Sequence, residues 1–363
     1  MEGVSGEKIA GLVMYYRYLY ILIPAYCMKM KIALLYNGIK RDMLTKQPLD
    51  AIAELDSQET IDYVRAALVS GGNEVVVIEA DGDACAKLKE GKREIDIVFN
   101  IAEGLRGESR ESYIPALCDL LGIPYTGSGA LTLGMCLNKA RTKETLTYYG
   151  IPTPTFQVFR SGEDELDRAL TFPLIVKLLH EGSQMGLSRD SIIYSEEDLS
   201  ARVAYLMREY EEPVIVEEFL DGREFTVGIV GNEVPLVLPI VEALFGHDQK
   251  TRLFAPDDPL LPYIPKDRVI NVKERSVCPA DVDDELRRTI EEIALNAYSA
   301  LDCKDWCRID LRMNGDVPNV LELNPIAGID PSYLLPRAAR AAGISYERLV
   351  NMIVEFAAKR YGL

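Results

Sequence analysis

The stretch Asp305–Ser332, DWCRIDLRMNGDVPNVLELNPIAGIDPS, contains two short segments in which apolar and polar residues alternate. These segments are Arg308–Arg312 and Val320–Asn324, and the loop between them carries Asn314-Gly315-Asp316. Alternation with a period of two on both sides of an Asn-Gly turn predicts a β-hairpin. The rest of the chain is interpreted from this hairpin outward.

One face of the predicted hairpin is polar. Residues two apart on a strand share a face, so Arg308, Asp310 and Arg312 point one way, and Glu322 and Asn324 share a face of the second strand. Two carboxylates and a carboxamide then converge, and such oxygen ligands suit Mg²⁺ when substrate phosphates complete the shell. Arg308 beside them would neutralise phosphate charge. The alternative is an ordinary hairpin whose polar face lies in water.

The composition indicates a globular protein with an acidic balance. The chain has 363 residues, of which 48% are hydrophobic and 27% charged, enough for two or three domains. Forty Lys and Arg against 57 Asp and Glu give a net charge of −17, which argues against nucleic acid or an anionic membrane as the main partner. Seven cysteines without a C-x-x-C pair suggest reduced thiols and a cytoplasmic location.

The first thirty residues form an extension of uncertain role. The run Gly11–Cys27 is apolar and aromatic, but Arg17 and Pro24 leave too short a stretch to span a bilayer. It also lacks the cleavage site of a signal peptide. We expect residues 1–30 to be non-essential, and Met28 or Met30 is a candidate start; an interfacial or oligomer-contacting helix is the alternative.

Residues 31–128 predict an N-terminal α/β domain. Lys31–Tyr36, Glu74–Ile78 and Ile95–Phe99 are compact apolar runs typical of buried strands, with helical spacing in Thr60–Val69 and around Leu88. Alternating strands and helices predict a Rossmann-like parallel sheet. Ligands of such sheets bind at the carboxyl ends of the strands.

Two further domains are predicted, at 129–220 and 221–363. Helical spacing runs from Ala130 through Lys139 to Tyr149, and strand candidates follow at Thr155–Phe159, Pro173–Leu178 and Pro213–Glu218. A central α+β domain is therefore expected. Residues 245–280 have little periodicity and predict a lid or substrate-binding segment, and Val282–Leu301 is an amphipathic helix before the hairpin.

A glycine- and serine-containing loop, residues 180–188, follows Lys177 directly. Small residues let backbone N–H groups approach phosphate oxygens, and a neighbouring Lys supplies positive charge. The spacing is not that of a Walker A loop. A plain hairpin turn is the alternative interpretation.

Taken together, these segments make the chain resemble the ATP-grasp superfamily and, within it, the D-alanine–D-alanine ligases. The matching segments are Val98–Asn100, Leu121–Gly129, Asn138-Lys139, Thr142-Lys143, Ile175–Lys177, Glu181–Ser183, Val216–Phe219, Gly222–Val227, Arg308–Asp310, Glu322–Asn324 and Ala342–Tyr346. The order runs from about Lys31 to the C-terminus. The resemblance implies an ATP-grasp fold and an ATP-dependent ligase that forms an amide through an acyl phosphate.

The resemblance also implies roles for individual residues. The expected nucleotide-binding residues are Lys139, Lys177, Glu181, Gly182, Ser183, Glu217, Glu218, Leu220, Glu224 and Lys250. Asp310, Glu322 and Asn324 would hold two Mg²⁺ ions, with Mn²⁺ as a possible substitute. Arg308, Gly328 and Ser183 are the expected catalytic residues: Arg308 at the transferring phosphoryl group, Gly328 at the second substrate or the tetrahedral intermediate, and Ser183 in the loop over the triphosphate.

The amino-acid pockets depart from the family. The family's glutamate for the first substrate's ammonium has only Glu54, Asp56 and Ser57 as candidates here, and its serine for the second carboxylate falls at Tyr333, with Ser332 one place early. The partners implied are a small amino acid or carboxylate and an amine, and a homodimer is possible. The alternatives are an ATP-grasp ligase with other substrates, a non-catalytic ATP-binding protein, and a kinase that stops at the acyl phosphate.

Overall fold

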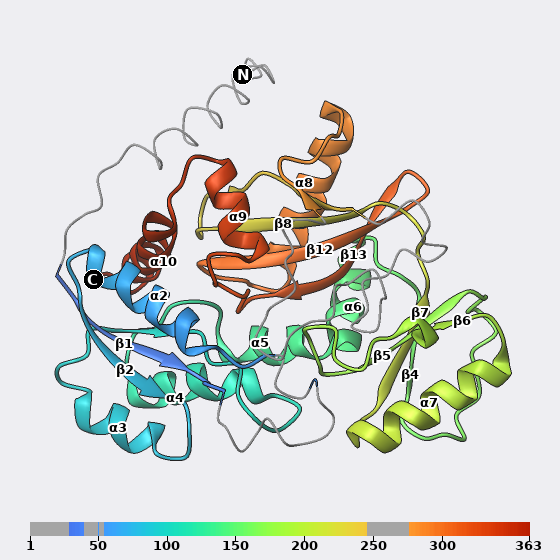
Figure 1. Cartoon of the computed structure of the whole chain (residues 1–363), viewed down its shortest axis with the longest axis horizontal. Coiled ribbons are helices and arrows are strands. Elements are labelled where there is room, and N and C mark those ends of the chain that lie inside the picture. Colours follow the sequence, from blue (N-terminus) through green and yellow to red (C-terminus); the bar gives the residue numbers. More distant parts are fainter. Residues whose placement is uncertain (1–28, 40–49, 51–53, 245–275) are drawn as a thin grey trace.

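Three β-sheets with flanking helices make up the computed structural model of the chain (Figure 1). The structure describes residues 29–39, 50, 54–244 and 276–363. The predictions for the N-terminal extension, for Lys250 and for most of the 245–280 segment lie outside these residues. No helix in the described part is long and apolar enough to cross a membrane.

The N-terminal sheet is parallel, as the alternation of strands and helices predicted. Its strand order is β2-β1-β3. The elements are β1 (Lys31–Tyr36), α2 (Gln58–Ser70), β2 (Glu74–Glu79), α3 (Ala84–Gly91), β3 (Ile97–Asn100), η2 (Arg110–Ser112) and α4 (Tyr113–Leu121). Asn37, directly after β1, is buried and joins the loops at this edge: it donates to Ala80 O at 3.0 Å and accepts from Gly104 N at 2.8 Å. The carboxyl edge of the sheet is therefore tightly ordered.

The helical pattern from Ala130 to Tyr149 is broken, whereas the sequence predicted one continuous helix. It forms α5 (Ala130–Leu137) and α6 (Lys139–Tyr148). Asn138 lies between them in an extended conformation, and its side chain accepts from Arg141 N at 3.0 Å as the N-cap of α6. A capping Asn competes with helix continuation, and the break places Lys139 at a helix N-terminus.

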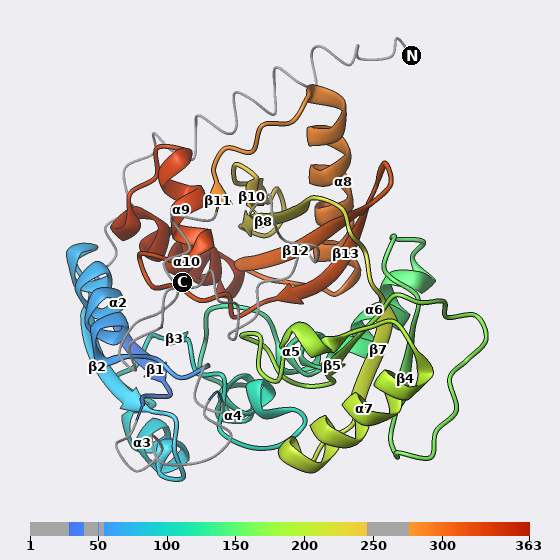
Figure 2. The ribbon, with the colours of Figure 1, turned by 45° about the vertical axis from the view of Figure 1, so that its right-hand side comes forward.

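A four-stranded antiparallel sheet follows, with the order β4-β7-β5-β6. Its elements are β4 (Phe156–Phe159), β5 (Leu174–Leu178), η3 (Arg189–Ser191), β6 (Ile192–Ile193), α7 (Glu196–Tyr210) and β7 (Val214–Glu218). The glycine loop connects β5 to η3. Figure 2 shows α7 covering one face of this sheet.

The C-terminal sheet has the order β11-β10-β8-β12-β13, with β9 paired to β8. Its strands are β8 (Glu224–Val230), β9 (Leu236–Val237), β10 (Val241–Ala243), β11 (Ser276–Val277), β12 (Trp306–Asn314) and β13 (Val317–Asn324). Its helices are α8 (Asp284–Ala300), α9 (Leu334–Ala341) and α10 (Tyr346–Tyr361). The hairpin prediction is confirmed, and both strands extend to a two-residue turn at Gly315-Asp316.

Buried polar contacts join the N-terminal and C-terminal parts. α2 lies beside α10 in Figures 1 and 2, and Asn351 donates to Ala67 O at 2.8 Å. Asp305, which is fully buried, accepts from Gly127 N at 2.7 Å and from Arg360 at 2.8 Å. These contacts fix the sheet that carries the hairpin against the edge of the parallel sheet.

Candidate active site

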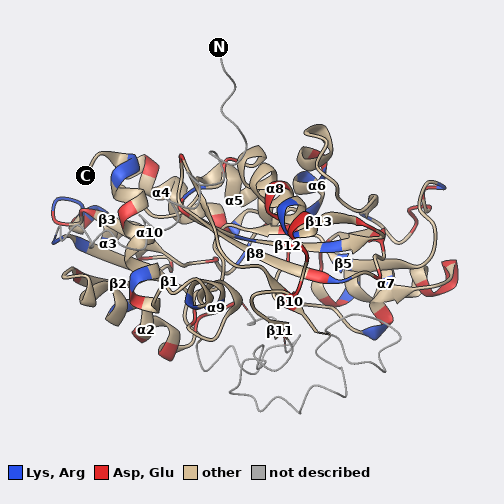
Figure 3. Cartoon of the chain, turned by 90° about the horizontal axis from the view of Figure 1, so that it is seen from above, with Lys and Arg blue, Asp and Glu red and all other residues tan. Residues whose placement is uncertain are grey.

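The polar face of the β12–β13 hairpin brings the predicted metal ligands together. Asp310 lies opposite Glu322, and Arg308 lies opposite Asn324. The Asn324 carboxamide nitrogen is 3.3 Å from an Asp310 oxygen and 3.4 Å from a Glu322 oxygen. Arg308 Nη2 is 2.9 Å from Asp310 Oδ2. The two strands carry both basic and acidic positions (Figure 3), and the convergence inferred from the alternating pattern is present.

A bulge in β13 explains why Val320 and Glu322, two residues apart on one strand, lie on opposite faces of the sheet. The pairing register shifts after Asp310, so that Leu311 pairs with Val320 and Leu321 is the extra residue. A bulge adds one residue to one strand and turns the following side chains. Val320 is consequently buried in the core with Leu311, while Glu322 stays on the polar face.

Cations surround the Glu322 carboxylate. Lys139 Nζ lies 3.8 Å from Glu322 Oε2, and Arg308 Nη2 lies 3.7 Å from Oε1. Burial raises the pKa of Glu322, but Lys139, Arg308 and Lys177 lower it to about 2. Glu322 is therefore ionised throughout the neutral range and available as a metal ligand.

These residues fit a divalent cation that is completed by phosphate oxygens. Among the described residues no group of three or more His, Cys, Asp or Glu forms a self-sufficient metal site. Asp310 and Glu322 supply carboxylate oxygens, and rotation of the Asn324 amide would present its oxygen. Mg²⁺ is commonly held by one or two carboxylates together with substrate phosphates, so the donor set matches that ion.

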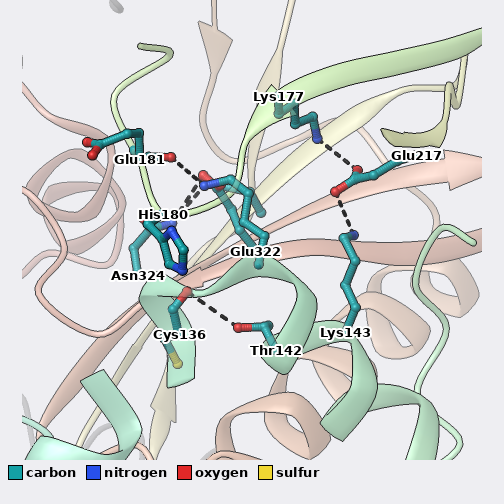
Figure 4. Close-up of polar contacts among 12 residues, drawn as sticks. Cys136, Thr142, Lys143, Lys177, His180, Glu181, Glu217, Glu322 and Asn324 are labelled. Atoms are coloured by element: carbon teal, nitrogen blue, oxygen red, sulfur yellow. Dashed lines mark hydrogen bonds and ion pairs between the residues drawn. The ribbon is translucent and has the colours of Figure 1, made fainter. Parts of the chain in front are cut away.

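A buried chain of ion pairs lies near the hairpin residue Glu322 (Figure 4). Glu217 on β7 is 1% exposed, and its Oε2 accepts from Lys177 Nζ of β5 at 2.9 Å. Its Oε1 is 3.4 Å from Nζ of Lys143 on α6, whose side chain has no exposed surface. Burial lowers the pKa of Lys143 to about 8 although Glu217 opposes the shift. One carboxylate thus pairs with two lysines, and these three side chains together carry a net positive charge.

The glycine loop lies close to the N-terminus of α6. The Lys139 side chain donates to Glu181 O. Ser183, Gln184 and Gly186 have φ angles of 47°, 62° and 68°. Residues that carry a side chain rarely adopt such left-handed values. Such conformations recur at functional loops, and this one turns the loop back over the end of β5.

The residues expected at the base and ribose lie along β7, β8 and the loop between them. Leu220 is buried, and the Glu218 carboxylate accepts from Thr155 N at 3.1 Å. Glu224 Oε2 is 3.3 Å from Arg312 Nη1. Burial raises the pKa of Glu224 to about 7, although Arg312 opposes the shift.

The candidate substrate residues are held by neighbouring side chains. Glu54 Oε2 accepts from Arg110 at 2.6 Å, and Ser57 is the N-cap of α2. Burial, followed by the charge of Asp330, raises the pKa of Asp56 to about 7. Ser332 is exposed and donates to Asp330 at 2.6 Å.

Gly328 is covered by an aromatic ring. A Cβ added at Gly328 would lie 2.4 Å from Cδ2 of Tyr333. Burial raises the pKa of Tyr333 to about 12, with further contributions from Asp330 and Asp56. Tyr333 therefore lies between Gly328 and an acidic group of side chains.

Two buried cations that contact the site residues were missed by the sequence reasoning. Arg110 contacts Glu54 and Glu181, and Lys143 contacts Glu217. Arg110 lies in Glu108-Ser109-Arg110-Glu111, a polar run that looks like a surface loop. Lys143 has the (i, i+4) spacing from Lys139 that places both on neighbouring turns of one helix face, which was an available signal.

The fold and this site define an ATP-grasp protein. A family model described as D-ala D-ala ligase C-terminus matches residues 145–355. An uncharacterized protein of Sinorhizobium fredii is 34% identical over 307 residues, covering 83% of this chain and 88% of that protein. The D-alanine–D-alanine ligase of Desulforudis audaxviator is 34% identical over 306 residues, covering 82% of this chain and 92% of that enzyme.

The fold agrees with these sequence matches. A crystal structure of D-alanine–D-alanine ligase from Bacillus anthracis complexed with ATP superposes with a TM-score of 0.70 at 24% identity, covering 92% of this chain and 99% of that one. The chain belongs to the D-alanine–D-alanine ligase family. It is an ATP-grasp ligase, an enzyme that forms a carbon–nitrogen bond.

Proposed function

We propose that the protein joins a carboxylate to an amine through an acyl phosphate, in the manner of the D-alanine–D-alanine ligases. The γ-phosphoryl group of ATP passes to a carboxylate oxygen, and the bond to the β-phosphate oxygen breaks to leave ADP. The amine nitrogen then attacks the carbonyl carbon, loses a proton, and phosphate departs. The observation that carries this proposal is the convergence of Asp310, Glu322 and Asn324 with Arg308 and Lys139 at the polar face of the hairpin.

The chain's own residues supply positioning and charge. Lys139 and Lys177 would bind phosphate oxygens, and Arg308 would donate to the transferring phosphoryl group, where negative charge develops. Mg²⁺, held by Asp310 and Glu322, would neutralise phosphate charge. The glycine loop would exclude water from the acyl phosphate.

At the nucleotide end, the predicted base and ribose residues would fix the direction of ATP. Glu224 would bind the ribose hydroxyls, and the backbone near Glu218 and Leu220 would line the adenine pocket. The buried pair of Lys177 with Glu217 supports this arrangement, because it fixes the ammonium group at the phosphate side of the pocket.

The second candidate is the same chemistry with substrates other than two D-alanines. It is favoured by the Tyr333 ring over Gly328, at the place where the family's second carboxylate is expected. The Asp56 carboxyl beside Asp330 adds to this difference. Both candidates require turnover, which separates them from an ATP-binding protein without ligase activity.

The test is ADP release from Mg²⁺-ATP across D- and L-amino acids, small carboxylic acids and amines, with products identified by mass spectrometry. Release with D-alanyl-D-alanine formed supports the first candidate. Release with another amide supports the second. ADP and an acyl phosphate without any amide indicate a kinase, and no stimulated release across the panel contradicts ligase function.

A further inference from the structure

The Arg110 guanidinium lies between the N-terminal part of the chain and the glycine loop. It belongs to η2, directly before α4, and its side chain is 6% exposed. Nη1 donates to His180 O at 3.0 Å and to Glu181 Oε1 at 3.2 Å. Nη2 donates to Glu181 Oε2 at 2.7 Å and to Glu54 Oε2 at 2.6 Å. A single buried side chain thus contacts three residues from two distant segments.

Glu54 extends this contact to the loop backbone. Its second oxygen, Oε1, accepts from Gly182 N at 2.6 Å. Arg110 therefore holds the beginning of the loop twice: through the backbone and side chain of residues 180–181, and through Glu54 at Gly182. Space at Gly182 is tight, because an added Cβ would lie 2.6 Å from Glu54 Oε1.

The far end of the loop is held by a separate carboxylate. Asp50 Oδ2 accepts from Gly186 N at 2.8 Å, and the Tyr210 hydroxyl donates to Asp50 at 2.9 Å. No contact of Arg110 is involved there. The two ends of the loop can therefore be released independently, which gives the structure an internal control.

The geometry points to Arg110 as a positioning residue that keeps the glycine loop closed over the reacting groups. This inference rests on the proposed function. The polar contacts of the Arg110 side chain among the described residues are with His180, Glu181 and Glu54 rather than with Lys139, Lys177 or the hairpin carboxylates, so it acts through Glu181 and Glu54. Loss of the contact would let the loop open, and water would reach the acyl phosphate.

Only an arginine satisfies this arrangement. The planar guanidinium forms paired hydrogen bonds to the Glu181 carboxylate while a third acceptor, Glu54, shares Nη2. A lysine ammonium is a point donor and cannot hold the same fork. Without the cation, Glu54 and Glu181 would face each other as two partly buried carboxylates. Burial raises the pKa of Glu181 to about 7. The charge of Arg110 opposes this shift, and the charge of Glu54 adds to it.

The experiment uses Arg110→Lys and Arg110→Met in the full chain, with Asp50→Asn as the variant of the other loop end. Arg208→Met is the matched control, since the Arg208 side chain is 69% exposed and its guanidinium contacts Glu209 and the ring of Tyr205, away from the glycine loop contacts of Arg110. Two quantities are measured for each protein. They are the amide hydrogen exchange at Gly182 and Gly186, and the number of ADP molecules released per amide bond formed.

We expect both Arg110 variants to exchange faster at Gly182 with Gly186 unchanged, and the reverse in Asp50→Asn. The ratio of ADP to amide should rise about fivefold or more in Arg110→Lys, because water intercepts the intermediate. Unchanged exchange and an unchanged ratio in Arg110→Lys would overturn the inference. If Arg110→Met does not fold, Arg110→Lys decides alone.

Failure of the proposed function is distinguishable from failure of this inference. If wild-type protein forms no amide with any substrate pair, the ADP ratio has no meaning, and the proposed function fails. The exchange measurement still decides whether Arg110 closes the loop, because it compares Gly182 with Gly186 in the same protein.

Discussion

The proposed nucleotide end and the proposed substrate end of the site differ in how many cations lie beside their carboxylates. At the nucleotide end the pKa values of Glu217 and Glu322 are lowered, whereas that of Glu224 is raised. At the nucleotide end, Glu217 lies between two lysines, and Glu322 lies near Lys139 and Arg308. Burial alone would raise their pKa values, but these cations lower both. Both carboxylates are therefore ionised near neutral pH. In the proposed site each would hold a cation that binds phosphate: a lysine at Glu217 and Mg²⁺ at Glu322.

At the substrate end, carboxylates outnumber the cations. Burial raises the pKa of Glu111 to about 8 and that of Asp56 to about 7. Glu103 is shifted in the same direction by burial, then by Glu54 and Glu111. The comparison teaches that burial raises the carboxyl pKa at both ends, and that the shift is reversed only at Glu217 and Glu322 among these residues, where two or more cations lie within reach.

The largest effect is expected at the hairpin, from Glu322→Gln. This change removes one negative charge from the proposed metal-binding face with little change in side-chain volume. We expect turnover to fall by at least about 100-fold, since even the outer partners of metal ligands are worth 10–100-fold. The melting temperature should change little. The measurement is ADP release under saturating Mg²⁺-ATP.

Glu347→Gln, on the exposed side of α10, is the control for Glu322→Gln. It makes the same Glu-to-Gln change away from the proposed active site, and we expect wild-type turnover. Near-normal activity in Glu322→Gln would show that the hairpin carboxylates do not hold the metal, and the contrast between the two ends of the site would lose its functional meaning.

A large effect on stability is expected from Glu217→Gln. The variant leaves the fully buried Lys143 ammonium without its carboxylate. Removing one partner of a buried ion pair costs about 3 kcal/mol or more. Urea unfolding should therefore show a clear drop in midpoint, and Lys143→Met added to Glu217→Gln should recover part of it, because the uncompensated charge is removed.

Glu218→Gln is the neighbouring control for this stability experiment. Glu218 follows Glu217 on β7 but is only partly buried, and its carboxylate accepts from a backbone N–H that an amide oxygen can also serve. We expect a change below about 1 kcal/mol. Equal losses for the two variants would mean that the ion-pair chain does not stabilise the nucleotide end.

The sequence was sufficient to predict the features that local pattern encodes. Alternation over five residues on each strand predicted that Asp310 and Glu322 lie on the polar face of the hairpin. The two residues are opposite each other in the structure. The parallel N-terminal sheet followed from alternating strand and helix patterns for the same reason. In both cases neighbouring residues in the chain are neighbours in the element, so their spacing contains the geometry.

The sequence did not contain the contacts that join distant segments. Arg110 lies 56 residues from Glu54 and 71 from Glu181, and no local period connects them. Its flanking residues are polar, which makes a buried guanidinium look like part of a solvated loop. The helix break at Asn138 was missed for another reason: the apolar spacing continues across it, and only the capping contact stops the helix.

The smallest effect, and the most direct test of the proton balance at the substrate end, is expected from Glu111→Gln. Burial, followed by the charge of Glu54, raises the pKa of Glu111 in the folded protein from its ordinary value of 4.5 to about 8, and Arg110 opposes the shift. Between these values the folded protein binds more protons than the unfolded chain, so stability is lost as pH rises through that range. A glutamine has no proton to lose and should avoid this loss.

Thermal unfolding of Glu111→Gln and wild type at pH 5 and pH 9 measures this difference. We expect similar melting temperatures at pH 5 and a higher melting temperature for the variant than for wild type at pH 9. Glu108→Gln, three residues earlier on an exposed loop, should show no such dependence on pH. A constant difference at both pH values would mean that Glu111 is ionised in the folded protein, and that the substrate end stabilises its carboxylates as the nucleotide end does.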